Sequence, residues 1–516
     1  MPGSGQSPPP APLGAFLGRP DPATSAARPR SLLTQPLVRL YLPMLLVFMA
    51  TRVALHAAGL RMNVDLRWMF LSDPADLRHH LIRTIFYFHA FAPGTNLLTG
   101  LLLKLDPEHL VGWATAIFWA SGFLLVVSLF RVLEALGLSR RSALGIAFAF
   151  SLLPQTLYLE NLYLYTYPCA ALLCFAAWLF WRALLRPTIA AWSALFFTCA
   201  TLGWLYTTFH LFWLAAMVLA GFALTARGTR RRVLLAAAAP CLLLFALYAK
   251  NYAVFGVFGA TSWGGGNLTL TTTRRMPVSL RDQWIQEGKL SPFAAISVFA
   301  PPADYLSFFP AGQRYPWPGS NELSKPSLDN EPNYNHGLFL DVNRQRRADA
   351  SYYIKARPLE YLTTVFENNL PALFSSTTHW HPDDAGATSP HVEHRRVLGG
   401  YERIYDQIVH SFPIPPVGLY IFLPPCLVWA AFRAGRGLRE SDEQLRARAA
   451  LLAFCTFQVL FVVSISCLFT AQESSRYRFA VEPCIWALTA ATLHAAGRRL
   501  RGRFARHGLA PAPASR

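Results

Sequence analysis

Long apolar runs separated by short clusters of charge dominate this sequence. Ten of these runs approach the length of roughly 20 residues that an α-helix needs to cross a bilayer. They occupy residues 37–59, 112–131, 142–158, 163–182, 188–206, 208–226, 232–250, 413–432, 449–470 and 478–497. The pattern predicts an all-α polytopic membrane protein with about ten transmembrane helices.

Composition and charge support a membrane protein. Of the 516 residues, 53% are hydrophobic and 15% are charged, whereas a soluble domain carries roughly 25% charged residues. The net charge of +19 would suit nucleic-acid binding, but residues 251–412 hold 14 basic and 15 acidic side chains. The excess positive charge therefore lies in loops on one side of the predicted spans, where it indicates topology, and no nucleic-acid partner is expected.

The arginine-rich side is predicted to be cytoplasmic by the positive-inside rule, which places both termini in the cytoplasm. The high arginine content, and cysteines that all fall inside predicted spans, favour a bacterial inner membrane and predict no disulfide in the outer loops. The expected N-terminal parts are a disordered cytoplasmic leader at 1–36 and a module of about seven spans at 37–250, with a first outer loop at 60–111. A large outer segment of mixed structure should follow at 251–412, then a C-terminal module of about three spans at 413–497 and a basic cytoplasmic tail at 498–516.

The first outer loop gathers acids and imidazoles close to the membrane. Apolar residues between 95 and 105 recur at helical spacing over too short a distance to cross, which predicts a helix along the membrane surface. A carboxylate at headgroup level can accept a proton from an incoming hydroxyl while a lipid phosphate departs. Asp65 and Asp76 are the candidate bases, and His89 is a candidate substrate contact. Helix capping or a solvated charge is the alternative for the acids, and Asp73, which precedes a proline, has the form of an N-cap.

Two later stretches could hold an anion on the outer side. Lys250 and Arg274 flank a glycine cluster at 264–266, whose backbone amides would suit a phosphate, although a flexible turn would also explain the glycines. Arg476 and Arg478 run against the charge rule, so a carboxylate or a bound phosphate should compensate them.

Two acids near the membrane extend this candidate site. Glu482 begins the last predicted span, where an acid indicates either a function or an ion pair, and a purely structural arginine–glutamate pair stays open. Glu160 follows the third span and could line the same cavity as Asp65.

The outer segment offers less specific signals. Residues 341–362 have near-helical spacing, which predicts one or two helices over the membrane mouth. His379 and His381 precede two acids, but a third ligand of defined spacing is missing. We therefore assign no metal and no cofactor, although a divalent metal is compatible with the sequence.

The order of these parts resembles the GT-C type of integral membrane glycosyltransferase, in particular the bacterial dolichyl-phosphate-mannose mannosyltransferase-like, or family 39-like, branch. The resemblance covers residues 37–497 and rests on an acidic first outer loop and a few short motifs. These are Phe86-Tyr87-Phe88-His89 to Pro93, Lys250-Asn251 to Phe255-Gly256, Thr261-Ser262-Trp263, and Arg476-Tyr477-Arg478-Phe479 with Glu482-Pro483.

The resemblance implies an enzyme that moves a sugar from a polyprenyl-phosphate donor to an acceptor on the outer face of the membrane, with inversion. It also implies an acid of the first outer loop as base: Asp65 is the best match because it follows the first span most closely, and Asp76 is second. His89 matches the loop histidine of the family, but Phe91-Ala92-Pro93 stands where the family usually has Gln-Pro-Pro. The acceptor would be a glycan, a lipid or a protein.

Two other classes of function stay open at this point. A transporter or flippase of a lipid-linked saccharide would need charged or broken helices near the middle of the membrane. A non-catalytic membrane scaffold would bind a partner through the outer segment, and would be favoured if Asp65 and Asp76 pointed away from any cavity.

Overall fold

A computed structural model describes residues 36–377, 390–413, 415, 417–470 and 474–506. The chain forms two compact units, Met1–Ala50 and Thr51–Arg516, and their boundary falls inside helix α1 (Pro36–Ala57). The described part of the first unit is the start of this helix, and all the other elements belong to the second unit. The predicted leader and the end of the basic tail lie outside the described residues.

Six helical stretches among the described residues are long and apolar enough to cross a membrane. They are Arg39–Ala57 within α1, Leu110–Ala135 (α5), Thr166–Leu185 (α8), Arg227–Phe255 with α11 (Arg230–Phe255), Gly418–Gly437 with α18 (Leu423–Gly437), and Glu443–Phe469 (α19). A seventh arises if α6 (Arg140–Ser151) and α7 (Pro154–Glu160), which meet at a bend of 60°, form one broken span. The expectation of an all-α membrane protein is therefore confirmed.

The other three predicted spans coincide with helices that fall short in length or composition. Helix α9 (Ile189–Leu205) has 17 residues and α10 (Leu211–Leu224) has 14, while α21 (Glu482–Arg506) begins with an acid and ends in arginines. An apolar run alone does not fix where a helix ends: the backbone N–H of Trp213 donates to His210 Nδ1 at 3.2 Å, so α10 starts later than the apolar pattern indicated. Length and composition thus support six or seven spans in the described part of the chain and leave the count of ten unconfirmed.

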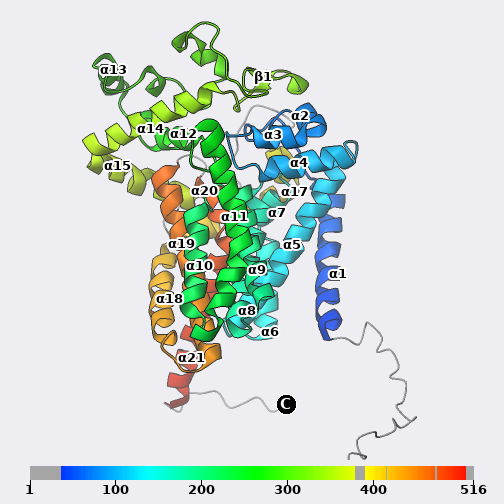
Figure 1. Ribbon diagram of the computed structural model, residues 1–516. Helices are drawn as coiled ribbons and strands as arrows, with labels where there is room; N and C mark the ends of the chain where they lie inside the picture. Colours follow the sequence, from blue (N-terminus) through cyan, green and yellow to red (C-terminus); the bar gives the residue numbers. More distant parts are fainter. Residues whose placement is uncertain (1–35, 378–389, 414, 416, 471–473, 507–516) are drawn as a thin grey trace, which may run out of the picture. The chain divides into compact units, whose positions relative to one another are not determined.

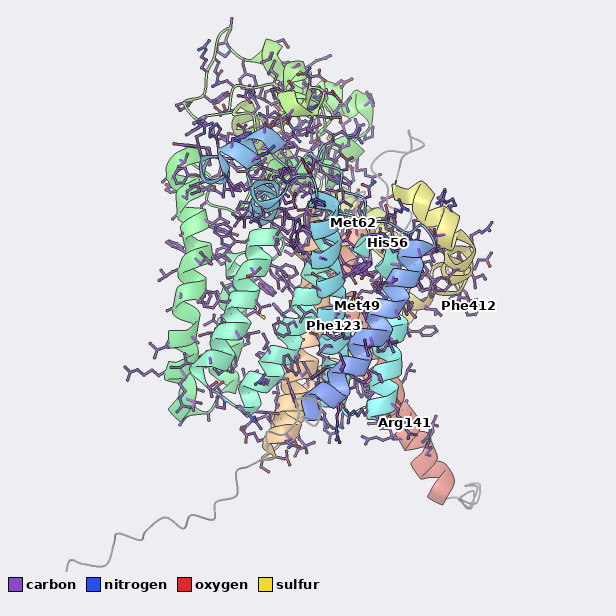
Figure 2. The ribbon with its side chains drawn as sticks, turned by 90° about the vertical axis from the view of Figure 1, so that its right-hand side faces the viewer. Met49, His56, Met62, Phe123, Arg141 and Phe412 are labelled. Atoms are coloured by element: carbon purple, nitrogen blue, oxygen red, sulfur yellow. The ribbon has the colours of Figure 1, made fainter. Side chains whose placement is uncertain are left out.

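The long helices of the second unit form a bundle. Helix α5 packs along α8, α8 along α9, and α9 along α11, and Figure 1 shows these helices running side by side. Figure 2 places Arg141 near one end of the helices and Met62 near the opposite end. We call the end that carries Met62 and the first outer loop the outer end.

The first outer loop folds into three short helices at this outer end. They are α2 (Pro74–His79), α3 (Leu81–Phe86) and α4 (Gly94–Leu105). The helix predicted at 95–105 is therefore present as α4. It buries Leu102 and Leu103 against Leu77 and Leu81, because apolar residues three or four apart share one face of a helix. The predicted N-cap is also confirmed, since the Asp73 side chain accepts from the backbone of α2.

The outer segment is made of helices and one small hairpin. Its elements are α12 (Gly264–Thr271), η3 (Thr273–Arg275), α13 (Val278–Gln286), η4 (Pro292–Ala294), η5 (Pro302–Phe308), β1 (Ser324–Lys325), η6 (Pro326–Leu328), β2 (Glu331–Pro332), α14 (Leu338–Ala356), α15 (Pro358–Thr364), η7 (Val365–Asn369), α16 (Leu370–Phe374), α17 (Pro390–Asp406) and η9 (Gln407–Ser411). Two further short helices lie outside it, η10 (Gly418–Phe422) at the start of the Gly418–Gly437 stretch and α20 (Ser474–Phe479) before the last helix. Strands β1 and β2 are antiparallel, with Ser324 opposite Pro332. Helices α14 and α15 confirm that residues 341–362 are helical, and their predicted place over the membrane mouth stays a prediction. Pro358 separates the two helices because proline interrupts a helix.

The glycine cluster 264–266 is neither a flexible turn nor an open cradle. It forms the first turn of α12, which packs directly on α14. A Cβ atom at Gly265 would lie 1.9 Å from the carbonyl oxygen of Asn343, and the backbone N–H of Gly266 donates to Asn343 Oδ1 at 3.0 Å. The glycines therefore allow two helices to approach closely, which corrects the expectation of a turn.

The cysteines behave as their positions indicated. All eight lie in described helices of the bundle, all are unpaired, and seven of them are buried, Cys241 being half-buried.

Candidate active site

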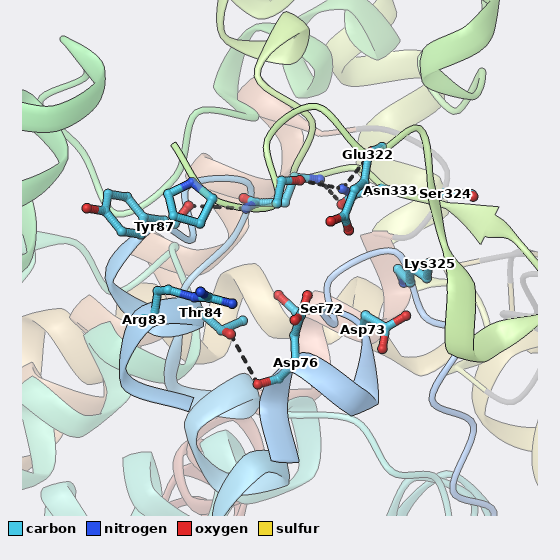
Figure 3. A pocket seen from close by; sticks show the side chains of 13 residues that line it. Ser72, Asp73, Asp76, Arg83, Thr84, Tyr87, Glu322, Ser324, Lys325 and Asn333 are labelled. Carbon is cyan, nitrogen blue, oxygen red and sulfur yellow. Dashed lines mark hydrogen bonds between the residues drawn. The ribbon is translucent and has the colours of Figure 1, made fainter. Parts of the chain in front are cut away.

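A polar pocket lies at the outer end, between the first outer loop and the outer segment. It encloses about 540 Å³, including space open to solvent. In Figure 3, Asp73, Asp76 and Arg83 come from the first outer loop, and Glu322 and Lys325 approach from the outer segment. The pocket thus joins side chains about 250 residues apart in the sequence.

Local sequence turns the acids of the first outer loop toward this pocket. Asp73 caps α2, its side chain accepting from the backbone N–H of Ala75 at 2.7 Å, and Pro74 occupies the first helical position. Leu77 is fully buried on the other side of the helix, against α4. Asp76, one residue earlier, lies on a different side of the helix and lines the pocket. The hydroxyl of Thr84 donates to the backbone carbonyl of Asp76 at 3.2 Å.

The outer segment closes the other side of the pocket. The hydroxyl of Ser327 donates to Asp73 Oδ1 at 2.6 Å, and its backbone N–H donates to Asp73 Oδ2 at 3.0 Å. The Nζ atom of Lys325 donates to the carbonyl of Trp68 at 2.9 Å. The hairpin between β1 and β2 is thereby tied to the first outer loop at two points.

The pocket holds charges of both signs in a partly dry environment. Burial lowers the pKa of Lys325 to about 8. Burial, followed by the charges of Asp76 and Asp73, raises the pKa of Glu322. Arg83 lies opposite Glu322 and partly offsets this effect. Such a site can bind a polar, hydroxyl-rich or phosphorylated molecule and can move a proton at a carboxylate.

The two candidate bases are in different surroundings. Asp65 is half-buried outside the residues that line the pocket. Its carboxylate accepts from Arg67, from the backbone N–H at 2.9 Å, from Nε at 3.0 Å and from Nη2 at 3.1 Å. Asp76 lines the pocket. Of the two acids, Asp76 is the one that a bound molecule in the pocket would meet.

His89 connects the first outer loop to the outer segment. It is buried, its Nδ1 atom lies 2.9 Å from Ser262 Oγ, and its backbone N–H donates to Asn335 Oδ1 at 2.9 Å. Burial, assisted by the charge of Lys250, lowers the pKa of His89 to about 3, so the ring is neutral. His89 reaches the pocket only through Asn335, which lines it.

Lys250 and Arg274 lie apart from the lining residues. The Nζ atom of Lys250 donates to the carbonyl of Phe88 at 3.2 Å and lies 5.2 Å from the ring centre of Phe255. Arg274 is exposed on η3, in the outer segment.

Glu160 belongs to a buried ion pair. Its carboxylate accepts from Arg52, from Nη2 at 2.7 Å and from Nε at 3.1 Å. A further bond from Arg52 Nη2 reaches the carbonyl of Ser151 at 2.9 Å, at the bend between α6 and α7. The pair therefore satisfies backbone that the bend leaves open, and Glu160 lies outside the residues lining the pocket.

Arg478 and Glu482 form a second buried pair. Nε of Arg478 donates to Glu482 Oε2 at 2.9 Å, and Nη1 donates to the carbonyls of Leu373 at 2.7 Å and Ser375 at 2.9 Å. The hydroxyl of Tyr420 donates to the other oxygen of Glu482 at 2.5 Å. These bonds hold the end of α16 against α20 and α21. They agree with the alternative that Arg478 and Glu482 form a purely structural ion pair.

Arg476 lies among aromatic rings at the outer end. It is buried, its Cζ atom is 5.6 Å from the ring centre of Tyr165 and 4.9 Å from that of Tyr477, and the ring of Tyr206 stacks on Tyr477. Phe70 of the first outer loop meets Tyr165 edge-on. The cation and these rings form a cluster beside the first outer loop.

Sequence reasoning missed several residues of the pocket. Arg83, Glu322, Lys325 and Asn335 line it together with Asp76. Arg83 lies close to Asp76 in the sequence, on the next short helix, which was an available signal. The outer-segment residues carried no such signal, because only the fold brings a two-residue strand pair over the first outer loop.

No group of three or more histidine, cysteine or acidic side chains in the described residues could hold a metal ion. His379 and His381, with the acids that follow them, lie outside the described residues.

Comparison with known proteins adds no family assignment. No family model matches this sequence, and no curated protein matches it either.

Proposed function

We propose that this protein is a membrane glycosyltransferase that moves a sugar from a polyprenyl-phosphate donor to an acceptor on the outer face of the membrane. Direct displacement at the anomeric carbon would invert its configuration. In this proposal Asp76 accepts the proton of the acceptor hydroxyl. The hydroxyl oxygen forms a bond to the anomeric carbon, and the bond from that carbon to the phosphate oxygen breaks.

The observation that carries the proposal is the position of Asp76 in a pocket built from two separate parts of the chain. Glu322 faces the same pocket and is close enough to influence, and be influenced by, the charge of Asp76. An acid that lines a polar cavity suits transfer to a hydroxyl. A scaffold would not need acids and cations from two separate parts of the chain to line one pocket.

Two cations suit the departing phosphate. Arg83 and Lys325 both line the pocket, where they could bind a phosphate and offset its charge. We therefore assign this role to them ahead of Lys250, Arg274 and Arg476. Asp65 is the second candidate for the base, since it follows the first helix most closely and its pairing with Arg67 is partly exposed.

The proposed topology has ten crossings, with α9, α10 and α21 as short or charged spans. Both termini are cytoplasmic and the pocket faces the outside, because the arginine-rich end of the helices is opposite Met62. A bacterial inner membrane is the proposed location, and the acceptor is a glycan, a lipid or a protein.

A transporter or flippase of a lipid-linked saccharide is the second candidate. The bend of 60° between α6 and α7, with the buried Arg52–Glu160 pair beside it, is the kind of broken, charged helix that transporters use. We prefer the enzyme because Arg52 and Glu160 bond each other and backbone, which gives this pair a structural role. The polar pocket, in contrast, is open to solvent and can admit a substrate.

The test is sugar transfer from radiolabelled polyprenyl-phosphate donors in membranes. Wild type is compared with Asp76→Asn, Asp65→Asn and the control Asp106→Asn. Asp106 is an acid of the same loop that pairs with His109 outside the pocket. We expect transfer by wild type and Asp106→Asn and its loss in Asp76→Asn, at equal protein amount and equal elution in detergent.

Other outcomes separate the candidates. Loss in Asp65→Asn with activity kept in Asp76→Asn would move the base to Asp65. Absence of transfer from every donor, together with movement of a labelled lipid-linked saccharide across vesicles containing the protein, would overturn the enzyme in favour of the transporter.

A further inference from the structure

Helix α17 and the π-helical turn η9 that continues it have an unusual distribution of side chains. Three of their polar side chains face the protein: His394, Glu402 and His410 are each less than 5% exposed. Three of their large apolar side chains, those of Tyr401, Ile404 and Ile408, are exposed. In a water-soluble domain the hydrophobic effect would produce the reverse arrangement.

The buried face of this segment contacts α7 and α16. The ring of His394 lies 5.1 Å from that of Tyr158 on α7, and His394 Nε2 is 3.5 Å from Glu402 Oε2. At the other end, His410 Nδ1 lies 2.8 Å from the carbonyl of Phe374. The segment is therefore held by the ring contact of His394 at one end and by the polar contact of His410 at the other, with Ile404 and Ile408 left exposed.

The outward apolar strip follows helical spacing. Tyr401, Ile404 and Ile408 are 44%, 59% and 56% exposed, and Phe412, just after η9, is 65% exposed. A step of three residues places Tyr401 and Ile404 on the same side of α17, and Ile408 and Phe412 continue the exposed apolar residues through and beyond η9. Figure 2 shows Phe412 at the edge of the molecule, beyond the helices of the bundle.

A basic strip runs beside the apolar one. Arg395, Arg396 and Arg403 are exposed, and the turn of about 100° per residue in α17 places Arg396 and Arg403 next to the side that carries Ile404. An apolar stripe next to a basic stripe is the pattern of a helix that lies in a membrane interface, with apolar groups among acyl chains and arginines at phosphates.

A neighbouring segment has the same character. Leu359 of α15 and Phe366 of η7 are 77% and 63% exposed. This segment is tied to the outer end of α19 by polar bonds, from the Tyr361 hydroxyl to the Leu468 carbonyl at 2.6 Å and from Asn369 Nδ2 to the Cys467 carbonyl at 2.9 Å. Exposed apolar side chains at the end of a candidate span are continuous with its lipid-facing surface, which argues for lipid as the occupant.

We propose that α17 and η9 form an interfacial helix that binds phospholipid at the outer end of the bundle, with Tyr401, Ile404, Ile408 and Phe412 among acyl chains and Arg395, Arg396 and Arg403 at headgroup phosphates. This assignment does not depend on the sugar transfer proposed above. It places the membrane boundary at the level of α7 and η10, where the buried Arg52–Glu160 and Arg478–Glu482 pairs lie.

The test places single spin labels in the full-length protein reconstituted in phospholipid vesicles. Cysteine replaces Ile404, Ile408 or Arg403 in turn. Background labelling of the native cysteines, seven of which are buried, is measured on the wild type. Phe308, an apolar residue of η5 that is 47% exposed in the outer segment, is the matched control. Collisions with oxygen report acyl chains, and collisions with a water-soluble nickel complex report solvent.

Labels at Ile404 and Ile408 should collide mainly with oxygen, whereas labels at Arg403 and Phe308 should collide mainly with nickel. Equal nickel access at Ile404, Ile408 and Phe308 would overturn the proposal, because the strip would then face water. Low access to both reagents, with slow label motion, would also overturn it and would assign the strip to a protein contact. A variant that does not elute as wild type is replaced by Tyr401→Cys, on the same strip.

Discussion

Ser327 of the outer segment donates two hydrogen bonds to Asp73 of the first outer loop, one from its hydroxyl at 2.6 Å and one from its backbone N–H at 3.0 Å. Asp73 also caps α2, so one buried carboxylate holds a helix start and a distant turn together. This clasp fixes the distance between the two walls of the pocket, and the position of Asp76 depends on it.

Loss of the Ser327 hydroxyl should loosen the pocket without unfolding the protein. Ser327→Ala removes one bond, a change of about 1 kcal/mol, and keeps the backbone bond. We expect a higher KM in the transfer assay with little change in thermal stability. Ser351→Ala is the control, because its hydroxyl bonds within α14, to the Arg347 carbonyl. An unchanged KM in Ser327→Ala, or the same rise in both variants, would contradict a role of the clasp in the pocket.

The buried pair of Arg478 and Glu482 should matter for stability. Glu482→Gln leaves the guanidinium without its charged partner, and breaking such a pair costs about 3–5 kcal/mol. We expect a marked fall in thermal unfolding temperature in detergent. The double variant Arg478→Met with Glu482→Leu removes both charges and should recover part of the loss. A raised donor KM at wild-type stability would instead indicate that Glu482 acts on substrate.

Two adjacent glycines should respond differently to alanine. A Cβ at Gly265 would lie 1.9 Å from backbone of Asn343, which cannot move without shifting α14. A Cβ at Gly264 would meet only the guanidinium tip of Arg347, at 3.0 Å. We therefore expect Gly265→Ala to lower the yield of folded protein and Gly264→Ala to be tolerated. Size-exclusion chromatography in detergent measures both, and equal tolerance would contradict the close packing of α12 on α14.

His89 should make the protein less stable in acid. Its pKa is about 3 in the folded protein, against an ordinary value of 6.5, so below pH 6.5 the unfolded chain binds a proton that the folded chain does not. The stability that neutral His89 provides is present above pH 6.5 and is lost as the pH falls toward 3. His336, whose pKa burial lowers to about 4, acts in the same direction.

His89→Gln should remove its share of this dependence, about 1.4 kcal/mol per pH unit between pH 6.5 and 3. Denaturant unfolding in detergent at a series of pH values measures the slope, with the exposed His109→Gln as control. The same slope in His89→Gln and wild type would show that His89 already carries a proton in the folded protein.

Much of the secondary structure could be predicted from the sequence, because it depends on local patterns. Helix α4 follows from apolar spacing, and the start of α2 follows from Asp73 and the proline after it. The long apolar helices follow from run length. The exact number of spans does not follow from run length. The turn between α9 and α10, in which His210 caps the start of α10, shortens the helical part of these runs.

The sequence by itself determined that this is an all-α membrane protein and which residues could carry chemistry, because hydrophobic run length, charge and residue type are properties of the chain alone. Only the tertiary structure decided which of those residues meet. Asp76 lines a pocket with Lys325, whereas Asp65, Glu160 and Arg478 are bonded to Arg67, Arg52 and Glu482. The physical reason is that a side chain's partners are set by long-range packing and by the need to satisfy buried charge, and neither is encoded in local spacing.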